Sequence, residues 1–350
     1  MRTTVLIAVL AAGCTGELDE STTTVEQENR CPPDVCSSNS GEVARNGMWE
    51  ANLYGEPDVN KISLQTRPPT KTDWRRRAQI WDAFGRPYDL YVKNGFISGI
   101  NPTTGRKISG ASLIGAKLHV LQSGQPLYHI RIDNVRWIKT PVGAPDLIEV
   151  YKMVWVPQQA SLGEGTLCDM NDYKWDDIKD ADQLQGMRSN ETLVFEGDRI
   201  DRDTLTMNKN EGWDPSWFNF GCAGRTLAKL RMTRKTQGNG TGDWSARQAA
   251  LKMLSADYCG TGDTFTRTGT RIGWMDDENL VTYARPPVQL EARWNEHGAY
   301  CVDAARLQTA QPHVWDYIWG TCLPTPCFDT LWSTPGFYEL AGAKIISAMF

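Results

Sequence analysis

Residues 127–135 read Leu-Tyr-His-Ile-Arg-Ile-Asp-Asn-Val, and residues 147–156 read Leu-Ile-Glu-Val-Tyr-Lys-Met-Val-Trp-Val. In the first stretch Tyr128, Ile130 and Ile132 alternate with other residues, so they share one face of an extended chain. The second stretch is rich in β-branched and aromatic residues, which favour strands. The two stretches predict a pair of half-buried β-strands.

The chain around this pair also indicates β-structure. Residues 116–121 and Thr192–Phe195 are short apolar runs, and glycines punctuate the chain between such runs. We interpret 110–115, a small-residue stretch, as a further strand. We therefore predict an antiparallel β-rich domain over residues 46–165.

Two helices are predicted further along the chain, over Ala223–Thr233 and Ser245–Tyr258. Asp243 precedes the second helix as a candidate N-cap. That helix carries a stripe of mostly small residues at helical spacing, with Arg247, Lys252 and Ser255 outside the stripe; its members are Ala246, Ala249, Ala250, Met253 and Leu254. The predicted fold class is α+β, with a β-rich amino-terminal half and a disulfide-stapled carboxyl-terminal domain containing two helices.

The composition excludes two broad classes of protein. The chain has 350 residues and a net charge of −5, so net charge does not drive nucleic-acid binding. Its 40% hydrophobic content is not arranged as a multispan membrane protein. The 14 tryptophans suit sugar stacking or a large core, and we expect most of them in the core.

The amino terminus resembles a lipoprotein signal peptide. Met1 and Arg2 precede a short apolar run that ends in Leu10-Ala11-Ala12-Gly13-Cys14. We expect cleavage after residue 13, acylation of Cys14 (palmitate among the acyl chains), and anchoring in the lipid bilayer. The expected location is outside the cytoplasm, at the outer membrane or cell surface.

Residues 14–45 are acidic, rich in Ser and Thr, and without apolar periodicity, which predicts a disordered tether. Beyond Cys14 the chain holds an even number of cysteines, which in an oxidising compartment predicts four disulfides. These cysteines are Cys31, Cys36, Cys168, Cys222, Cys259, Cys301, Cys322 and Cys327. None of these cysteines and none of the four histidines has zinc-ligand spacing, so we predict no metal and no cofactor.

Three motifs carry possible chemistry but favour simpler interpretations. Arg75-Arg76-Arg77 lies near Trp74 and Trp81, yet in an acidic chain it indicates a solvated face and no nucleic acid. The Gly110–Gly115 stretch misses the spacing of a nucleophile elbow by one residue. The acidic segment 169–182 lacks the ligand spacing of a calcium loop. Paired carboxylates for glycoside hydrolysis are left open, because sequence spacing does not reveal their distance in space.

One segment resembles a known family. Residues 255–272 begin Ser-Ala256-Asp257-Tyr258-Cys259-Gly260, which is similar to the signature of the ADYC-domain family of exported bacterial proteins. Similar elements occur at Gly165–Cys168, Phe220–Ala223, Glu291–Trp294 and Gly298–Cys301, so the resemblance spans roughly residues 130–330. The family has no assigned activity, so the resemblance implies a disulfide scaffold and no reaction.

The resemblance also guides domains and disulfides. We assign 166–335 to an ADYC-like domain and 336–350 to a carboxyl-terminal tail. Short loops suggest Cys31–Cys36 and Cys322–Cys327, whereas chain order and the family-like segments suggest Cys168–Cys222 and Cys259–Cys301. The family pattern has cysteines where Leu230 and Ala250 stand here, as if one disulfide between two packed helices were lost.

Asp257 lies eleven residues after Ala246, so its carboxylate should point with the apolar stripe into the interior, in the last turn of the helix. A buried carboxylate needs partners. We expect N–H groups of residues 260–262, or an arginine among Arg267, Arg271 and Arg293. The expected role is structural, with Asp257, Asp276 and Glu291 as candidate catalytic acids in the alternative.

The sequence thus favours a non-enzymatic, lipid-anchored binding or structural protein of the bacterial envelope or cell surface, with a protein or glycan ligand that it does not identify. The alternative is an envelope enzyme acting on glycan or peptide through acids near the ADYC motif. A Trp-lined cleft with two nearby carboxylates would favour the enzyme.

Overall fold

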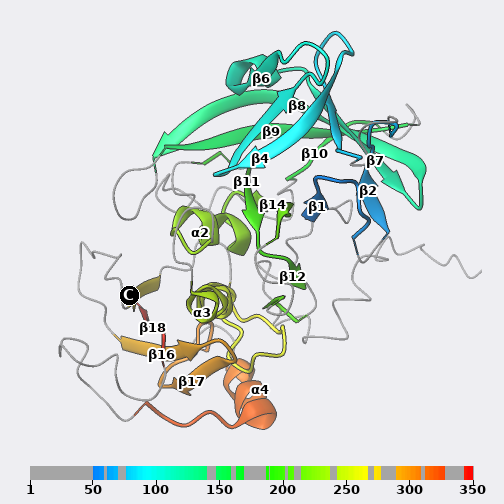
Figure 1. Ribbon diagram of the computed structural model, residues 1–350. Helices are drawn as coiled ribbons and strands as arrows, with labels where there is room; N and C mark the ends of the chain where they lie inside the picture. The colour runs from blue at the N-terminus through cyan, green and yellow to red at the C-terminus, as the bar shows by residue number, and fades with distance from the viewer. Residues whose placement is uncertain are drawn as a thin grey trace, which may run out of the picture.

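The computed structural model describes residues 50–58, 61–69, 76–139, 147–158, 163–168, 187–188, 190–201, 204–208, 214–236, 243–266, 272–276, 289–308, 312–327 and 343–349 (Figure 1). The predicted signal peptide, Cys14, the tether with Cys31 and Cys36, and the acidic segment 169–182 lie outside the described residues. In the part of the chain described, no helix has the length and apolar character needed to cross a membrane.

The larger sheet has twelve antiparallel strands within the described residues, in the order β1-β14-β11-β9-β8-β7-β3-β4-β5-β6, with β10 beside β9 and β2 beside β7. Its strands are β1 (Glu50–Asn52), β2 (Ile62–Leu64), β3 (Gln79–Trp81), β4 (Pro87–Lys93), β5 (Phe96–Ile100), β6 (Lys107–Ser109), β7 (Lys117–Gln122), β8 (Gln125–Lys139), β9 (Leu147–Pro157), β10 (Gly165–Thr166), β11 (Glu191–Gly197) and β14 (Asp214–Cys222).

The long pair β8–β9 confirms the two strands that the alternation predicts. Tyr128, Ile130 and Ile132 are all buried on one face. The register shifts by one residue between Ile132 and Asn134, a β-bulge. One extra residue exchanges the two faces of a strand. Ile132 is therefore buried in one hydrophobic core, here called the first core, and Ile138 in another, the second core. Strand β8 therefore serves both cores.

The sheet curves strongly, so that β4 and β5 contact β11 although they lie far from it in strand order (Figure 1). The Ile97 N–H on β5 donates to the Tyr151 hydroxyl on β9 at 2.8 Å. The first core fills the inside of this curve and includes Leu90, Val194 and Phe218.

The carboxyl-terminal half is layered against the outside of the larger sheet (Figure 1). Helix α2 (Thr226–Met232) packs on β14 and β11, and α3 (Trp244–Ser255) packs on α2. A four-stranded antiparallel sheet then covers α3, in the order β15 (Ile272–Asp276), β18 (Ile345–Met349), β16 (Gln289–Asn295) and β17 (Gly298–Val302). Helix α4 (His313–Cys322) and the small hairpin of β12 (Ile200–Asp201) and β13 (Thr206–Met207) complete the elements.

Helix α3 differs from the amphipathic helix that the sequence predicts. Asp243 caps it through the Ser245 N–H, as expected, but the helix ends at Ser255 because Ala256 is left-handed. Arg247, Lys252 and Ser255, predicted to lie outside the apolar stripe, are buried like the stripe itself. The helix lies between α2 and the smaller sheet, so it has no solvent face. Leu230 of α2 and Ala250 of α3 are both buried in the second core.

Several other expectations are corrected. The tail expected at 336–350 contains β18, an inner strand of the smaller sheet. Helix α4 was not predicted, and Gly110–Leu113 is a 3-10 turn (η1) instead of a strand. The larger sheet continues past residue 165 through β11 and β14, so strands of both expected domains share one sheet. The chain is α+β, and mostly sheet.

Three disulfides lie within the described residues. Cys168–Cys222 forms as expected and joins the chain after β10 to the end of β14. The other two expected pairings are wrong, because the partners are exchanged: Cys259 bonds Cys322, and Cys301 bonds Cys327. Helix α4, absent from the sequence prediction, brings Cys322 next to Cys259.

Candidate functional site

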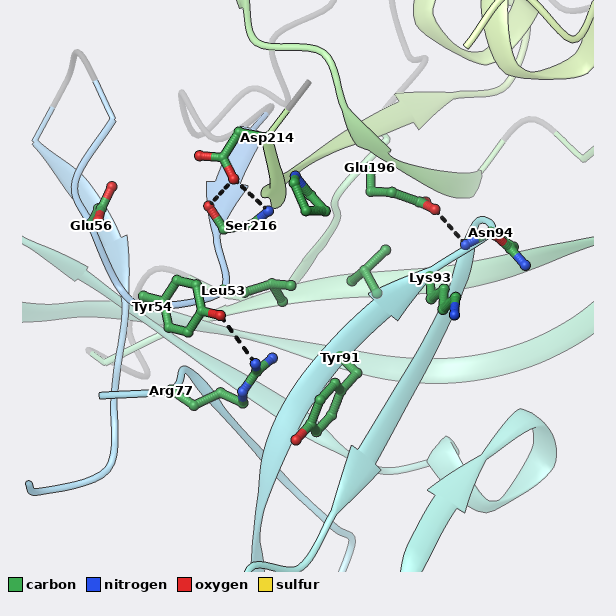
Figure 2. Close-up of a pocket in the computed structure, with 12 residues that line it drawn as sticks. Leu53, Tyr54, Glu56, Arg77, Tyr91, Lys93, Asn94, Glu196, Asp214 and Ser216 are labelled. Atoms are coloured by element: carbon green, nitrogen blue, oxygen red, sulfur yellow. Dashed lines mark hydrogen bonds between the residues drawn. The ribbon is translucent and has the colours of Figure 1, made fainter. Parts of the chain in front are cut away.

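A pocket of about 860 Å³ opens where the chain after β1, the end of β4 and the start of β14 meet (Figure 2). Its wall combines apolar, aromatic and charged side chains, namely Leu53, Tyr54, Glu56, Arg77, Tyr91, Val92, Lys93, Asn94, Glu196, Asp214, Pro215 and Ser216. This volume lies within the range of small-molecule sites.

Arg77 makes four contacts that position its guanidinium in this pocket. Its Cζ lies 4.1 Å from the ring centroid of Tyr91 and 5.1 Å from that of Tyr54. Its Nη1 donates to the Leu90 carbonyl at 3.1 Å, and its Nη2 donates to the Tyr54 hydroxyl at 3.3 Å (Figure 2). These contacts fix the plane of the guanidinium.

The carboxylates of the pocket are directed at other donors. Glu196, 4% exposed, accepts the backbone N–H groups of Asn94 (2.5 Å) and Gly95 (3.1 Å). Asp214 accepts the Ser216 hydroxyl at 2.6 Å, and Glu56 accepts the Asn52 amide at 3.3 Å.

Glu196 also connects distant parts of the chain. Asn94 and Gly95 form the two-residue turn between β4 and β5, and both have positive φ, as a type I′ hairpin requires. Glu196 on β11 accepts the N–H groups of this turn, and Arg231 on α2 donates to the Asn94 carbonyl at 3.3 Å. The turn is thereby fixed to β11 and α2.

The Ala256–Gly260 segment forms the turn that follows α3. Ala256 has φ of +56°, and its N–H donates to the carbonyls of Lys252 and Met253. The Asp257 N–H donates to the Lys252 carbonyl at 2.9 Å. These are the bonds of a helix C-cap, so Asp257 lies beyond the helix and not in its last turn as the sequence predicts.

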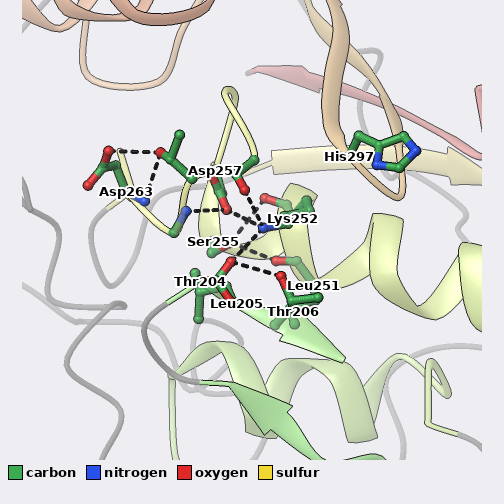
Figure 3. Close-up of polar contacts among 12 residues, drawn as sticks. Thr204, Leu205, Thr206, Leu251, Lys252, Ser255, Asp257, Asp263 and His297 are labelled. Atoms are coloured by element: carbon green, nitrogen blue, oxygen red, sulfur yellow. Dashed lines mark hydrogen bonds and ion pairs between the residues drawn. The ribbon is translucent and has the colours of Figure 1, made fainter. Parts of the chain in front are cut away.

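Asp257 and Lys252 form a buried ion pair (Figure 3). Lys252 Nζ lies 2.6 Å from Asp257 Oδ2, and it also donates to the carbonyls of Thr204 (2.7 Å) and Gly260 (3.1 Å). The Gly262 N–H donates to the same carboxylate at 3.0 Å. Burial raises the pKa of Asp257, and the Lys252 ammonium opposes that rise. The interior position and the loop N–H donor are confirmed; the cation is a lysine and not an arginine.

Tyr258 joins a second buried group. Its hydroxyl donates to Glu291 Oε1 at 2.7 Å and accepts the Arg306 N–H at 2.6 Å. The Arg306 Nε lies 2.6 Å from the same Glu291 oxygen. Burial raises the pKa of Tyr258, and the adjacent Glu291 charge raises it further, so this hydroxyl stays protonated.

The last two residues of the segment attach the turn to other elements. Cys259 bonds Cys322 at the end of α4. Gly260 has φ of +71°, and a Cβ built on it would lie 1.8 Å from the His297 carbonyl oxygen. The Ala299 N–H donates to the Tyr258 carbonyl at 2.8 Å. Each residue of the segment thus has a structural contact.

The family model of the ADYC domain matches residues 110–308, which include this turn. The chain belongs to the ADYC-domain family. Neither the search of curated proteins nor the search of solved structures gives a match. The ADYC domain so matched includes β7 to β17 and the buried turn that carries its name.

The pocket straddles the edge of the ADYC domain. Glu196, Asp214 and Ser216 come from the matched residues, whereas Tyr54, Arg77, Tyr91 and Lys93 come from the chain before residue 110. The chemistry of the pocket therefore depends on residues that the family match does not include.

The three candidate catalytic acids of the ADYC domain are each paired in the interior. Asp257 pairs with Lys252, Asp276 with Lys235 at 2.6 Å, and Glu291 with Arg306. All three carboxyl groups are fully buried, and none lines the pocket. Among the described residues, no three His, Cys, Asp or Glu side chains lie together as a metal site.

The pocket is not apparent from the sequence. Arg77 lies in a run of arginines whose pattern favours a solvated face, and no sequence pattern marks Tyr54 or Tyr91. The available signal was the alternation of Arg77, Ala78, Gln79 and Ile80, which places Arg77 opposite the buried face. That alternation does not reveal which rings the guanidinium contacts.

Proposed function

We propose that this protein is a lipid-anchored binding protein of the bacterial envelope or cell surface, and that its ligand enters the pocket around Arg77. Three disulfides are consistent with a location outside the cytoplasm. The signal-like amino terminus supplies the anchor in this proposal, through Cys14.

One contrast carries the choice of binding over catalysis. In the pocket, the Arg77 guanidinium is fixed between two tyrosine rings and has no carboxylate partner among the described residues. In the ADYC domain, each of the three candidate acids forms an ion pair with a buried lysine or arginine. A charged group held ready in an open cavity suits recognition of a ligand, whereas fully buried ion pairs suit a scaffold.

The anchor is tested by metabolic labelling and fractionation. Cells expressing the full chain with a palmitate analogue should show label on the protein and place it in the membrane fraction. Cys14→Ser should lose the label and leave the membrane fraction or stay unprocessed, whereas Cys31→Ser, a control that also removes one cysteine, should keep both properties. An unlabelled, soluble wild-type protein would contradict the anchor.

The binding site is tested separately by obstructing the pocket. Pro215 is exposed and lines it, so Pro215→Trp should fill part of the cavity without disturbing a buried contact. Thermal shifts produced by a small-molecule panel on the wild type should disappear in Pro215→Trp. Shifts that persist unchanged in the variant would place the ligand elsewhere.

A further inference from the structure

We infer that the pocket recognises a carboxylate-bearing small molecule, with the ligand carboxylate bound by Arg77. This inference rests on the proposed binding function and adds the chemical class of the ligand. It depends on the state of Arg77, on the other charges of the pocket and on the apolar part of its wall.

Arg77 has hydrogen-bonding capacity to spare. A guanidinium has five N–H donors, and the structure uses two of them, on Leu90 and Tyr54. Tyr91 and Tyr54 contact the guanidinium through their rings, and three of its five N–H groups remain for a ligand. Because these contacts already position the side chain, ordering it costs a ligand less on binding.

The charge of Arg77 is also unpaired, in contrast to other arginines of this chain. Arg136 pairs with Glu191 at 2.5 Å, Arg247 pairs with Asp198 at 2.8 Å, and Arg306 pairs with Glu291. Arg77 makes no such pair in the described chain, although three carboxylates line the same pocket. Each of those carboxylates is instead bonded to a donor of its own, as described above.

The surroundings favour a carboxylate over a phosphate. A planar carboxylate matches the guanidinium fork with two parallel hydrogen bonds. A phosphate dianion would bring twice the charge near Glu56, Glu196 and Asp214, and repulsion would offset its gain at Arg77. Lys93 is exposed and is a second cation of the lining, and it lies on the side of the pocket where Asn94 and Glu196 are found (Figure 2).

The remaining wall indicates the body of the ligand. Leu53 and Val92 are buried apolar residues, and the tyrosines Tyr54 and Tyr91 are half-buried. These side chains suit an apolar or aromatic group of modest size. The expected ligand is therefore an organic acid with such a group, supplied either as a free acid or as the carboxyl end of a short peptide.

The test compares each acid with its own amide on the full chain. The probes are 3-phenylpropionate and acetyl-Ala-Phe, each titrated beside its neutral amide by calorimetry. The inference predicts saturable binding of at least one acid and binding of its amide weaker by about tenfold or more. Preference for the first acid points to a free organic acid, and preference for the second to a peptide carboxyl end.

Variants assign the effect to Arg77. Arg77→Gln should weaken the acid by about tenfold and leave the amide unchanged, and Arg77→Lys should be intermediate because it keeps charge but not the fork. Arg106→Gln, an exposed arginine outside the pocket, should bind like the wild type. If Arg77→Gln fails to fold, the acid–amide comparison on the wild type still decides.

Two results overturn the inference. Equal binding of acid and amide, lost in Pro215→Trp, would contradict the carboxylate and leave the binding function standing. No saturable binding of either acid up to about 10 mM, close to the weakest affinities of interest, would also overturn it. The labelling and fractionation experiment tests the anchor independently of both results.

Discussion

Gly260 packs directly on the backbone carbonyl of His297, so closely that a Cβ on Gly260 would lie 1.8 Å from that oxygen. The approach is reciprocal, because a Cβ on Gly298 would lie 2.7 Å from the Tyr258 carbonyl and 2.9 Å from the Gly260 nitrogen. The turn after α3 and the turn of the β16–β17 hairpin are therefore fitted backbone to backbone. This fit explains why a glycine follows the cysteine of the motif.

Gly260→Ala should destabilise the protein by about 2–5 kcal/mol. A left-handed backbone costs a non-glycine residue about 1–2 kcal/mol, and forcing two packed turns apart costs about 1–3 kcal/mol more. Urea unfolding followed by tryptophan fluorescence measures the loss.

The control for this prediction is Gly85→Ala. Gly85 has a similar φ of +76°, but a Cβ on it would meet nothing within 4 Å. It should lose only the backbone part, about 1–2 kcal/mol. Equal losses in the two variants would mean that the close approach to His297 carries no energy.

Peptide mapping without reduction should recover Cys168–Cys222, Cys259–Cys322 and Cys301–Cys327. Each of these bonds closes a loop across separate elements, so removing one, as in Cys259→Ser with Cys322→Ser, should cost about 2–5 kcal/mol. Recovery of peptides joining Cys259 to Cys301, or Cys322 to Cys327, would contradict the arrangement of α4 described here.

Glu196→Gln should loosen the β4–β5 turn. A neutral amide has one acceptor oxygen in place of the two that receive the Asn94 and Gly95 N–H groups, and its bonds are weaker than charge-assisted ones. We expect a loss of about 1–3 kcal/mol and faster amide exchange at residues 94 and 95. Glu164→Gln, which alters an exposed carboxylate paired with Arg131, should leave amide exchange at residues 94 and 95 unchanged. Protection at the turn that survives Glu196→Gln would refute the contact.

The His119–His129 pair should make stability fall in mild acid. Burial, followed by the charges of Lys117, His119 and Arg131, lowers the pKa of His129 from 6.5 to about 4, and burial lowers the pKa of His119. A depressed histidine pKa means that the unfolded chain binds the proton more tightly, so stability is lost as pH falls from 6.5 towards 4.

The melting temperature of His129→Gln should therefore change less than that of the wild type between pH 6.5 and 4. The ring is half-exposed, so solvent screening keeps the effect modest. His297→Gln, with a side chain 84% exposed, is the control and should follow the wild-type curve. Parallel curves for wild type and His129→Gln would contradict the shift.

Local signals made part of the fold predictable. The alternation around Ile130 follows from the two-residue period of a strand. Asp243 caps α3 by accepting the N–H of Ser245, its near neighbour in the sequence. Asp257 points inward as predicted, but helical phase is not the cause: the helix ends at Ser255, and the C-cap turn through the left-handed Ala256 sets the direction of this side chain. Each of these features depends on residues close together in the chain.

What depended on distant contacts was not predictable. The period of α3 suggested a solvent face, but the covering of that face by α2 and the smaller sheet is a tertiary arrangement. Helix α4 buries only Val314 and Ile318, too few positions for a clear periodic signal. The pocket joins Tyr54, Arg77 and Glu196, residues far apart in sequence, so no spacing reveals it.

The central claim is that the ADYC turn is a scaffold, and it rests on the buried Lys252–Asp257 pair. Removing one partner leaves the other charged and buried, which costs about 3–5 kcal/mol. Asp257→Asn and Lys252→Met should each lose about that much, whereas the double variant should lose clearly less than the two losses combined, because neither charge is left alone.

Urea unfolding of the wild type, the two single variants and the double variant tests this claim most directly. The scaffold account predicts large single losses and a coupling between the two sites of about 2 kcal/mol or more. Asp257→Asn with wild-type stability and no coupling to Lys252→Met would contradict it, since the carboxylate would then be retained for something other than the fold.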